Sequence, residues 1–350
     1  MKKSTLRTLP LRPFIWMCCQ SSAWPQIVET PKGRVEFIGL RNWDIATIEQ
    51  RLQYDSREKL FSNVLHDLTK RLGFAGAHCA VYRQDGRPYK VITVLEPEDA
   101  MRVRYLPEPV RQLPTPAAWV ELLKIVEERK FLNAMLDYGS TLKGAITTET
   151  LMSEADQKWF ALLQERRGEE DFTLALDRLA GDGDDKNRVI AAMVLANFGE
   201  RDSTWRALVS GLRDANEAVR TVCAQTLLSL VNYTPRKIDW ADSSVDFNLL
   251  LGGTNLTVYQ SVIEILLKTE VSPKLAGPLL QGDARELLLA YLRASHDHER
   301  KIAHDLLTRL VNRDFGYDGK RWDEWFTARI RLGRNAGSKK ENFVELSHRY

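Results

Sequence analysis

The sequence lacks the features that mark several common classes of protein. Its four cysteines, Cys18, Cys19, Cys79 and Cys223, have no metal-ligand spacing, and the last two lie singly within apolar patterns that favour core packing. Lys and Arg number 50 against 47 Asp and Glu, so the net charge of +3 lacks the basic excess of many nucleic-acid-binding proteins. No run approaches the ~18 apolar residues that a membrane-spanning helix needs. Two or three structural units are expected.

Catalytic motifs are also absent. The sequence contains no Walker loop, dinucleotide fingerprint, nucleophile elbow or zinc-protease helix. The densest group of possible metal ligands is ASHDHERKIAH, which carries His296, His298 and His304. Their spacing does not place all three on one helical face, and Asp297 is a suitable N-cap for a helix that starts there. We therefore predict no metal, no cofactor and no catalytic residue.

Residues 1–26 are interpreted as a leader. They have a basic start, a short apolar stretch (14–19) and small residues at Ser21 and Ala23, as a signal peptide requires. Arg12 and two prolines interrupt the apolar stretch, so a disordered leader or a wrongly assigned start codon stays open. An exported or periplasmic location is favoured slightly over a cytoplasmic one.

Residues 33–99 carry a pattern that predicts a small α/β domain. VEFIGL is a strand candidate, and WDIATIEQRL and LFSNVLHDLTKRLGF have helical spacing. Two β-rich runs then flank Asp85-Gly86, a strong hairpin signal. The resulting β-α-α-β-β order resembles the polypeptide-transport-associated (POTRA) fold, although no β-barrel sequence follows. A generic small α/β sandwich explains the same pattern.

The rest of the chain is predicted to be helical. Residues 100–116 are rich in proline and are interpreted as a linker. Amphipathic patterns then continue through residues 117–330, and residues 331–350 are interpreted as a polar tail. Trp322 and Trp325, near the end of the helical region, are expected to pack as a cap rather than to form an exposed binding pair.

The helical region contains an internal repeat. DGDDKNRVIAAMVLANF (182–198, repeat 1) aligns with DANEAVRTVCAQTLLSL (214–230, repeat 2), and weaker copies begin at Gly253 (253–269, repeat 3) and Ala294 (294–310, repeat 4). The repeats start 32, 39 and 41 residues apart, which suits helical pairs joined by loops of varying length. Such pairs cannot bury their apolar faces alone, so they are expected to stack.

These repeats resemble HEAT repeats of the short bacterial type. The resemblance implies a ladder in which the turn aspartate and the arginine six positions later pair between neighbouring units. Asp182 with Arg188 and Asp214 with Arg220 match both positions, and Arg300 matches one. Repeat 3 matches neither, so the ladder should be interrupted there. We predict a mainly α fold, in which a C-terminal α-solenoid of HEAT-like helical pairs follows a small α/β domain.

The function predicted from this architecture is a non-catalytic scaffold or adaptor that binds a protein partner of unknown identity. The solenoid surface and the α/β domain would be its two docking modules. Two alternatives stay open: an enzyme of the DNA glycosylase or bilin lyase type, since HEAT-like arrays include both, and a cell-envelope assembly or sensing protein. No clear nucleic-acid partner and no transmembrane helix are expected.

Overall fold

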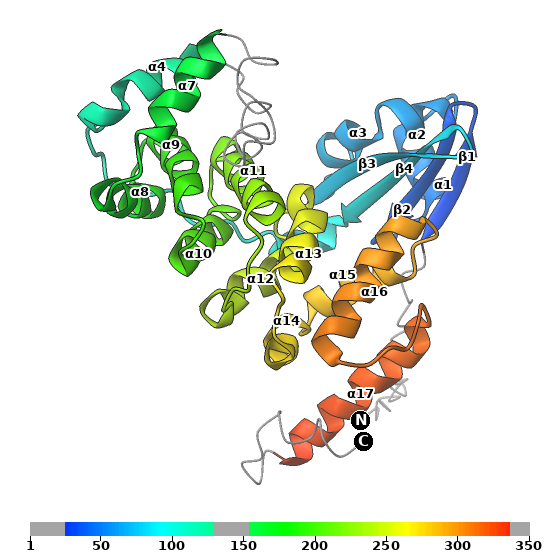
Figure 1. The fold of residues 1–350 in the computed structure, drawn as a ribbon. Coiled ribbons are helices and arrows are strands. Elements are labelled where there is room, and N and C mark those ends of the chain that lie inside the picture. The colour runs from blue at the N-terminus through cyan, green and yellow to red at the C-terminus, as the bar shows by residue number, and fades with distance from the viewer. Residues whose placement is uncertain (1–24, 129–153, 337–350) are drawn as a thin grey trace, which may run out of the picture.

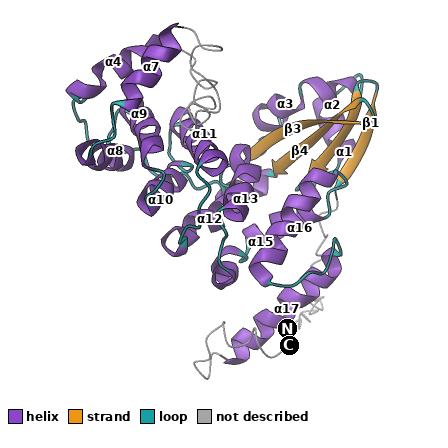
Figure 2. Cartoon of the chain, viewed as in Figure 1, coloured by secondary structure: helices purple, strands orange, loops and turns teal. Residues whose placement is uncertain are grey.

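The structure is a computed structural model that describes residues 25–128 and 154–336. It is mainly helical, with one four-stranded sheet in the N-terminal part (Figure 1, Figure 2). Both Cys18 and Cys19 and nearly all of the predicted leader lie outside the described residues.

The sheet has the strand order β1-β2-β4-β3. The first two strands form an antiparallel hairpin, β2 and β4 are parallel, and β3 is antiparallel to β4. The strands are β1 Gln26–Thr30, β2 Gly33–Ile38, β3 Gly76–Gln84 and β4 Arg87–Leu95. The order of the last three strands agrees with the sequence pattern, but the second predicted helix is divided at Asn63 into Glu58–Ser62 and Val64–Lys70. Strand β1 is an addition, and its first residue lies inside the predicted leader.

The two faces of the sheet are covered by different helices, one face by the helices between β2 and β3 and the other by C-terminal helices. The first set is α1 Ile45–Leu52, α2 Glu58–Ser62 and α3 Val64–Lys70. Val35 and Phe37 point to this side and share a core with these helices. Ile38 and Val91 point to the opposite side and belong to the core of the C-terminal helices. Because both faces are buried, the central strands read as nearly continuous apolar runs.

The C-terminal helices follow one another in antiparallel pairs (Figure 1). Repeats 1 to 4 supply the second helix of the pairs α8/α9, α10/α11, α12/α13 and α15/α16, and the short helix α14 lies between the last two pairs. The bounds are α8 Glu169–Gly181, α9 Asp185–Leu195, α10 Asp202–Gly211, α11 Glu217–Tyr233, α12 Ser244–Leu251, α13 Tyr259–Lys268, α14 Ala276–Leu279, α15 Asp283–Leu292 and α16 Asp297–Val311.

Helices α4 (Val120–Glu128) and α7 (Glu154–Gln164) precede this series, and α17 (Gly319–Ala336) ends it. Trp322 is fully buried against Phe315 and Phe326, which is the cap packing expected of it, and Trp325 is partly buried beside them. Helix α17 continues past residue 330, where the sequence pattern had placed the start of a polar tail.

The described residues contain no single helix that is long and apolar enough to cross a membrane by itself. Two consecutive helical segments, Ala241–Leu251 and Leu256–Lys268, pass this test only when they are taken together. The chain bends by 109° between them.

Candidate interaction site

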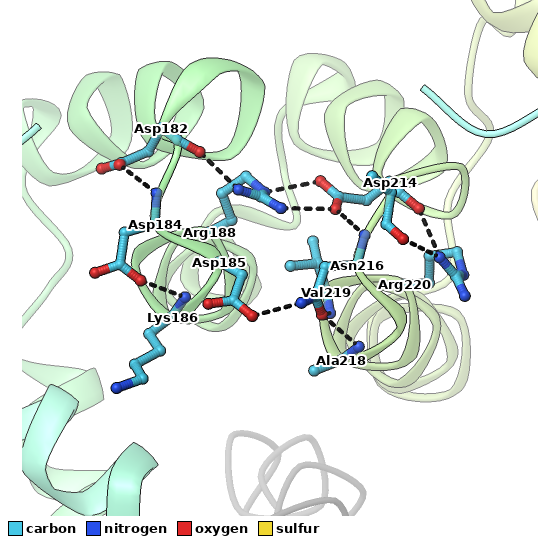
Figure 3. Close-up of polar contacts among 11 residues, drawn as sticks. Asp182, Asp184, Asp185, Lys186, Arg188, Asp214, Asn216, Ala218, Val219 and Arg220 are labelled. Carbon is cyan, nitrogen blue, oxygen red and sulfur yellow. Dashed lines mark hydrogen bonds and ion pairs between the residues drawn. The ribbon is translucent and has the colours of Figure 1, made fainter. Parts of the chain in front are cut away.

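Two of the predicted ladder residues form a buried ion pair between neighbouring helical pairs (Figure 3). Arg188 of repeat 1 donates through Nε and Nη2 to both carboxylate oxygens of Asp214 in repeat 2, each at 2.9 Å. Its Nη1 also donates to the backbone oxygen of Asp182 at 2.7 Å. The Arg188 side chain is fully buried. The guanidinium therefore ties the turn of its own repeat to the turn of the next one.

The turn aspartates also shape the starts of their helices. Asp182 accepts the amide of Asp184 at 3.0 Å, and Asp214 accepts the amide of Asn216 at 2.8 Å. In both repeats, the residue that donates this amide also caps the helix, because its side chain accepts an amide of the first helical turn. The two aspartates thus make the same side-chain to backbone hydrogen bond at equivalent positions of their repeats.

The other predicted ladder residues are not paired between repeats. Arg220 donates to the backbone oxygens of Asp214 and Ala215, and its guanidinium lies 4.0 Å from the centre of the Tyr105 ring. It meets no turn aspartate, because repeat 3 has Gly253 at that position. Arg300 pairs with Asp297, three residues away on its own helix, and lies over the Tyr317 ring. The ion pair between repeats thus occurs once among the residues that the ladder prediction named.

The proline-rich segment 103–116 runs along the turns of repeats 1 and 2. Leu106 donates its amide to the Arg213 backbone oxygen, and Gly183 donates to the Arg111 backbone oxygen, both at 2.6 Å. Arg111 also reaches Asp177 at 2.9 Å. The sequence had suggested a linker. In the structure, prolines favour an extended backbone in this segment, and polar groups of Arg104, Leu106 and Arg111 bond to the helical pairs.

The N-terminal part continues along the turns of repeats 3 and 4. Thr254 of repeat 3 donates its hydroxyl to the Arg102 backbone oxygen at 2.8 Å. At repeat 4, Glu36 of strand β2 accepts the amides of Ser295 at 2.5 Å and His296 at 3.1 Å. Each of the four turns therefore contacts a residue from the first 112 positions of the chain.

Glu36 occupies the place of a turn aspartate in repeat 4. The aligned residue of that repeat is Ala294, which has no carboxylate. The amide of His296 aligns with those of Asp184 and Asn216, and Glu36 accepts it as the aspartates accept theirs. Glu36 is completely buried and also accepts the Tyr89 hydroxyl at 2.8 Å. The sheet thus supplies the carboxylate that repeat 4 lacks.

A second buried carboxylate, Glu299, lies in the first turn of α16. Its side chain is completely buried, and neither oxygen has a hydrogen-bond partner among the described residues. Burial raises the pKa of Glu299 to about 7, and the nearby Glu36 acts in the same direction. Tyr82 and Gln260 lie close enough to favour the ionised form, but neither meets hydrogen-bond geometry with Glu299, and burial outweighs them.

Histidines of the ASHDHERKIAH stretch are separated by their contacts. The ring of His296 stacks on Tyr82, with 4.0 Å between the ring centres, and burial lowers the pKa of His296. His304, in the middle of α16, reaches Asp314 beyond the end of that helix through Nε2 at 2.8 Å. Within the described residues, 25–128 and 154–336, no group of three or more His, Cys, Asp and Glu side chains has the arrangement of a metal site.

The sheet has two edge strands, β1 and β3, and β3 carries the more exposed large apolar side chain. β3 pairs with β4 on one side, and no other described strand pairs with it. Val81, in the middle of β3, is 61% exposed. An edge of this kind presents backbone donors and acceptors in a row.

The sequence reasoning missed Glu36 and Glu299. For Glu299 a signal was present, because aligning the repeats puts Glu299 where Asn187, Val219 and Val258 stand. For Glu36 there was none, since its partners lie about 260 positions away. Comparison of the chain with protein-family models, with curated proteins and with solved structures finds no match.

Proposed function

We propose that this protein is a non-catalytic scaffold that binds a protein partner, with its helical pairs stacked as a HEAT-like α-solenoid. The aligned turns of repeats 1 and 2 and the Arg188–Asp214 pair support the stacked arrangement. The α/β part, with β4 between β2 and β3, is the second docking module, and we infer a POTRA-like fold for it.

The observation that carries the proposal is the open edge of β3. A partner that adds a strand there gains main-chain hydrogen bonds and covers the exposed Val81 side chain. The row of turns is less suitable, because residues of the N-terminal part already occupy it. We therefore assign partner binding to the β3 edge and the outer helical surfaces.

The test compares two exposed valines, Val81 on β3 and Val245 on α12, which are 61% and 68% exposed. A photo-crosslinking amino acid is placed at each position in the full chain, in its source cell. We expect position 81 to cross-link to a discrete protein. With that protein purified, Val81→Lys should weaken binding at least tenfold, because it places a charge at the strand edge, whereas Val245→Lys should not.

Two results would contradict this proposal. One is the absence of any cross-linked protein from either position. The other is a Val81→Lys variant that binds the identified partner as tightly as the parent chain, since the β3 edge would then have no part in recognition.

A further inference from the structure

The position of Glu299 is apolar or neutral in the other three repeats of the same chain. The aligned residues are Asn187, Val219 and Val258, and all of them are buried. A valine or an asparagine therefore satisfies the packing of this position. A carboxyl group costs free energy there unless it is protonated or paired, and in the described part of the chain Glu299 has no hydrogen-bond partner.

The surroundings of Glu299 also make its ionised form costly. The Glu36 carboxylate lies at the same helix start and accepts the backbone amides of Ser295 and His296. These two donors are therefore not available to a second carboxylate. Within residues 25–128 and 154–336, no Lys or Arg offsets the effect of burial on Glu299. The titratable groups that interact with Glu299 are Glu36 of β2, Tyr82 of β3 and Tyr291 of α15. Helix α13 contributes the neutral Gln260 and places Tyr259 against Tyr291. One contact further away, His296 and His298 lie against Tyr82, and Tyr89 lies against His296.

These groups lie where the sheet meets α15 and α16. Thr93 of β4 bonds the Tyr291 hydroxyl of α15 at 2.6 Å, and Tyr82 of β3 bonds Gln260 of α13 at 3.0 Å. Glu36 holds β2 to the start of α16. A change of charge at Glu299 therefore acts on the contact between the two parts of the molecule.

We propose that this contact is a proton-dependent latch, in which protonated Glu299 keeps the sheet seated on α15 and α16 and ionised Glu299 loosens it. Opening the contact lets water reach Glu299 and separates it from Glu36, so the ionised form is favoured in the open state. Loss of the Glu299 proton thus favours the open contact, and this effect does not depend on which partner the scaffold binds.

The direction of the pH dependence follows from the pKa of Glu299. That pKa is about 7 in the closed contact, against an ordinary value of 4.5 once the group is exposed. The stabilisation by the proton is complete below the ordinary pKa and is lost as the pH rises through about 7. Between pH 6 and pH 8 the closed contact should weaken by about tenfold.

The test is hydrogen exchange of the full chain from pH 5.5 to pH 8.5, corrected for the intrinsic pH dependence of amide exchange. The readout is protection of β2, β4 and α16, and amides of α9 and α11 are the internal reference. We expect protection of the first group to fall by about tenfold relative to the reference from pH 6 to pH 8. In Glu299→Gln, which keeps the shape of the protonated acid, it should stay level.

Glu299→Val gives a second variant, chosen after Val219 at the aligned position of the same chain, in case the amide disturbs the fold. It should also remove the pH dependence. A pH profile shared by the parent and both variants would overturn the proposal. Protection that rises with pH would also overturn it, because that sign belongs to a partly buried histidine such as His296, whose neutral form dominates at high pH.

Discussion

At the scale of single residues, two arginines at the same repeat position have different environments. Arg188 is fully buried and holds Asp214 through two hydrogen bonds. Arg220 is partly exposed, donates only to backbone oxygens and lies over the Tyr105 ring. The difference arises because the neighbouring turn carries an aspartate in one case and Gly253 in the other.

This contrast predicts unequal costs of truncation. Arg188→Ala should lower the free energy of unfolding by about 3 to 5 kcal/mol, because it leaves the Asp214 carboxylate buried without its cation. Arg220→Ala should cost about 1 to 2 kcal/mol, because it removes hydrogen bonds to carbonyls and a ring contact that water can partly replace. Urea unfolding followed by circular dichroism measures both.

Arg220→Ala serves as the matched control for Arg188→Ala. Equal losses would show that the Arg188–Asp214 pair adds little to stability. The resemblance to HEAT repeats predicted which side chains could meet in neighbouring repeats, and the alignment of the repeats predicted that repeat 3 would interrupt the series. It could not identify Tyr105 as the alternative contact of Arg220, because that residue lies more than 100 positions earlier.

At the scale of elements, segment 103–116 acts as a strap across the turns of repeats 1 and 2. Gly183 in the first of these turns lies very close to it. A Cβ atom there would lie 2.7 Å from the Gln112 side-chain nitrogen and 2.9 Å from the Arg111 backbone oxygen. The close approach explains why a residue without a side chain stands at this position.

Gly183→Ala should displace the strap locally while leaving the helices folded. Because Arg111 is half exposed and a trypsin site, cleavage after it should become several-fold faster in the variant, as local opening becomes easier. Limited proteolysis with mass spectrometry measures the rate. Gly168→Ala is the control, because a Cβ there meets only the Asp171 side chain of its own helix start. Unchanged cleavage in both variants would refute the close packing of the strap.

Elements with strong periodicity were predictable, and elements decided by distant contacts were not. The paired helices of the four repeats and the β3-β4 hairpin follow from apolar spacing and from Asp85-Gly86. Strand β1 was missed because its residues adjoin the leader-like stretch, although Pro31 to Gly33 offered a turn signal. The strap reads as a linker in sequence, since its hydrogen bonds depend on residues 66 to 109 positions away.

At the scale of the whole molecule, one face of the sheet shares a core with the C-terminal helices. Ile38, Val91 and Leu95 are buried among residues of the C-terminal helices. A boundary near residue 100 therefore separates two sequence patterns, but apolar side chains from both sides of that boundary pack in the same core. For this reason a domain division drawn from composition alone overstates the independence of the α/β part.

The shared core predicts that a fragment of residues 25–102 is incomplete. Cutting the chain there exposes the face that carries Ile38, Val91 and Leu95, together with the buried Glu36. The fragment should bind the dye ANS and self-associate in size-exclusion chromatography, whereas the full chain should do neither. A monomeric fragment that does not bind the dye would show that the sheet is an autonomous domain.

The contact between Glu36 and the start of α16 also has a consequence for biosynthesis. The two lie 260 positions apart, so a ribosome making this chain releases the sheet long before its covering helices exist. At the usual rate of about 5 to 20 residues per second, the wait is on the order of 10 to 50 seconds. During that time a nascent chain carries an uncovered apolar sheet face, which makes this protein a natural client for chaperones that act at the ribosome.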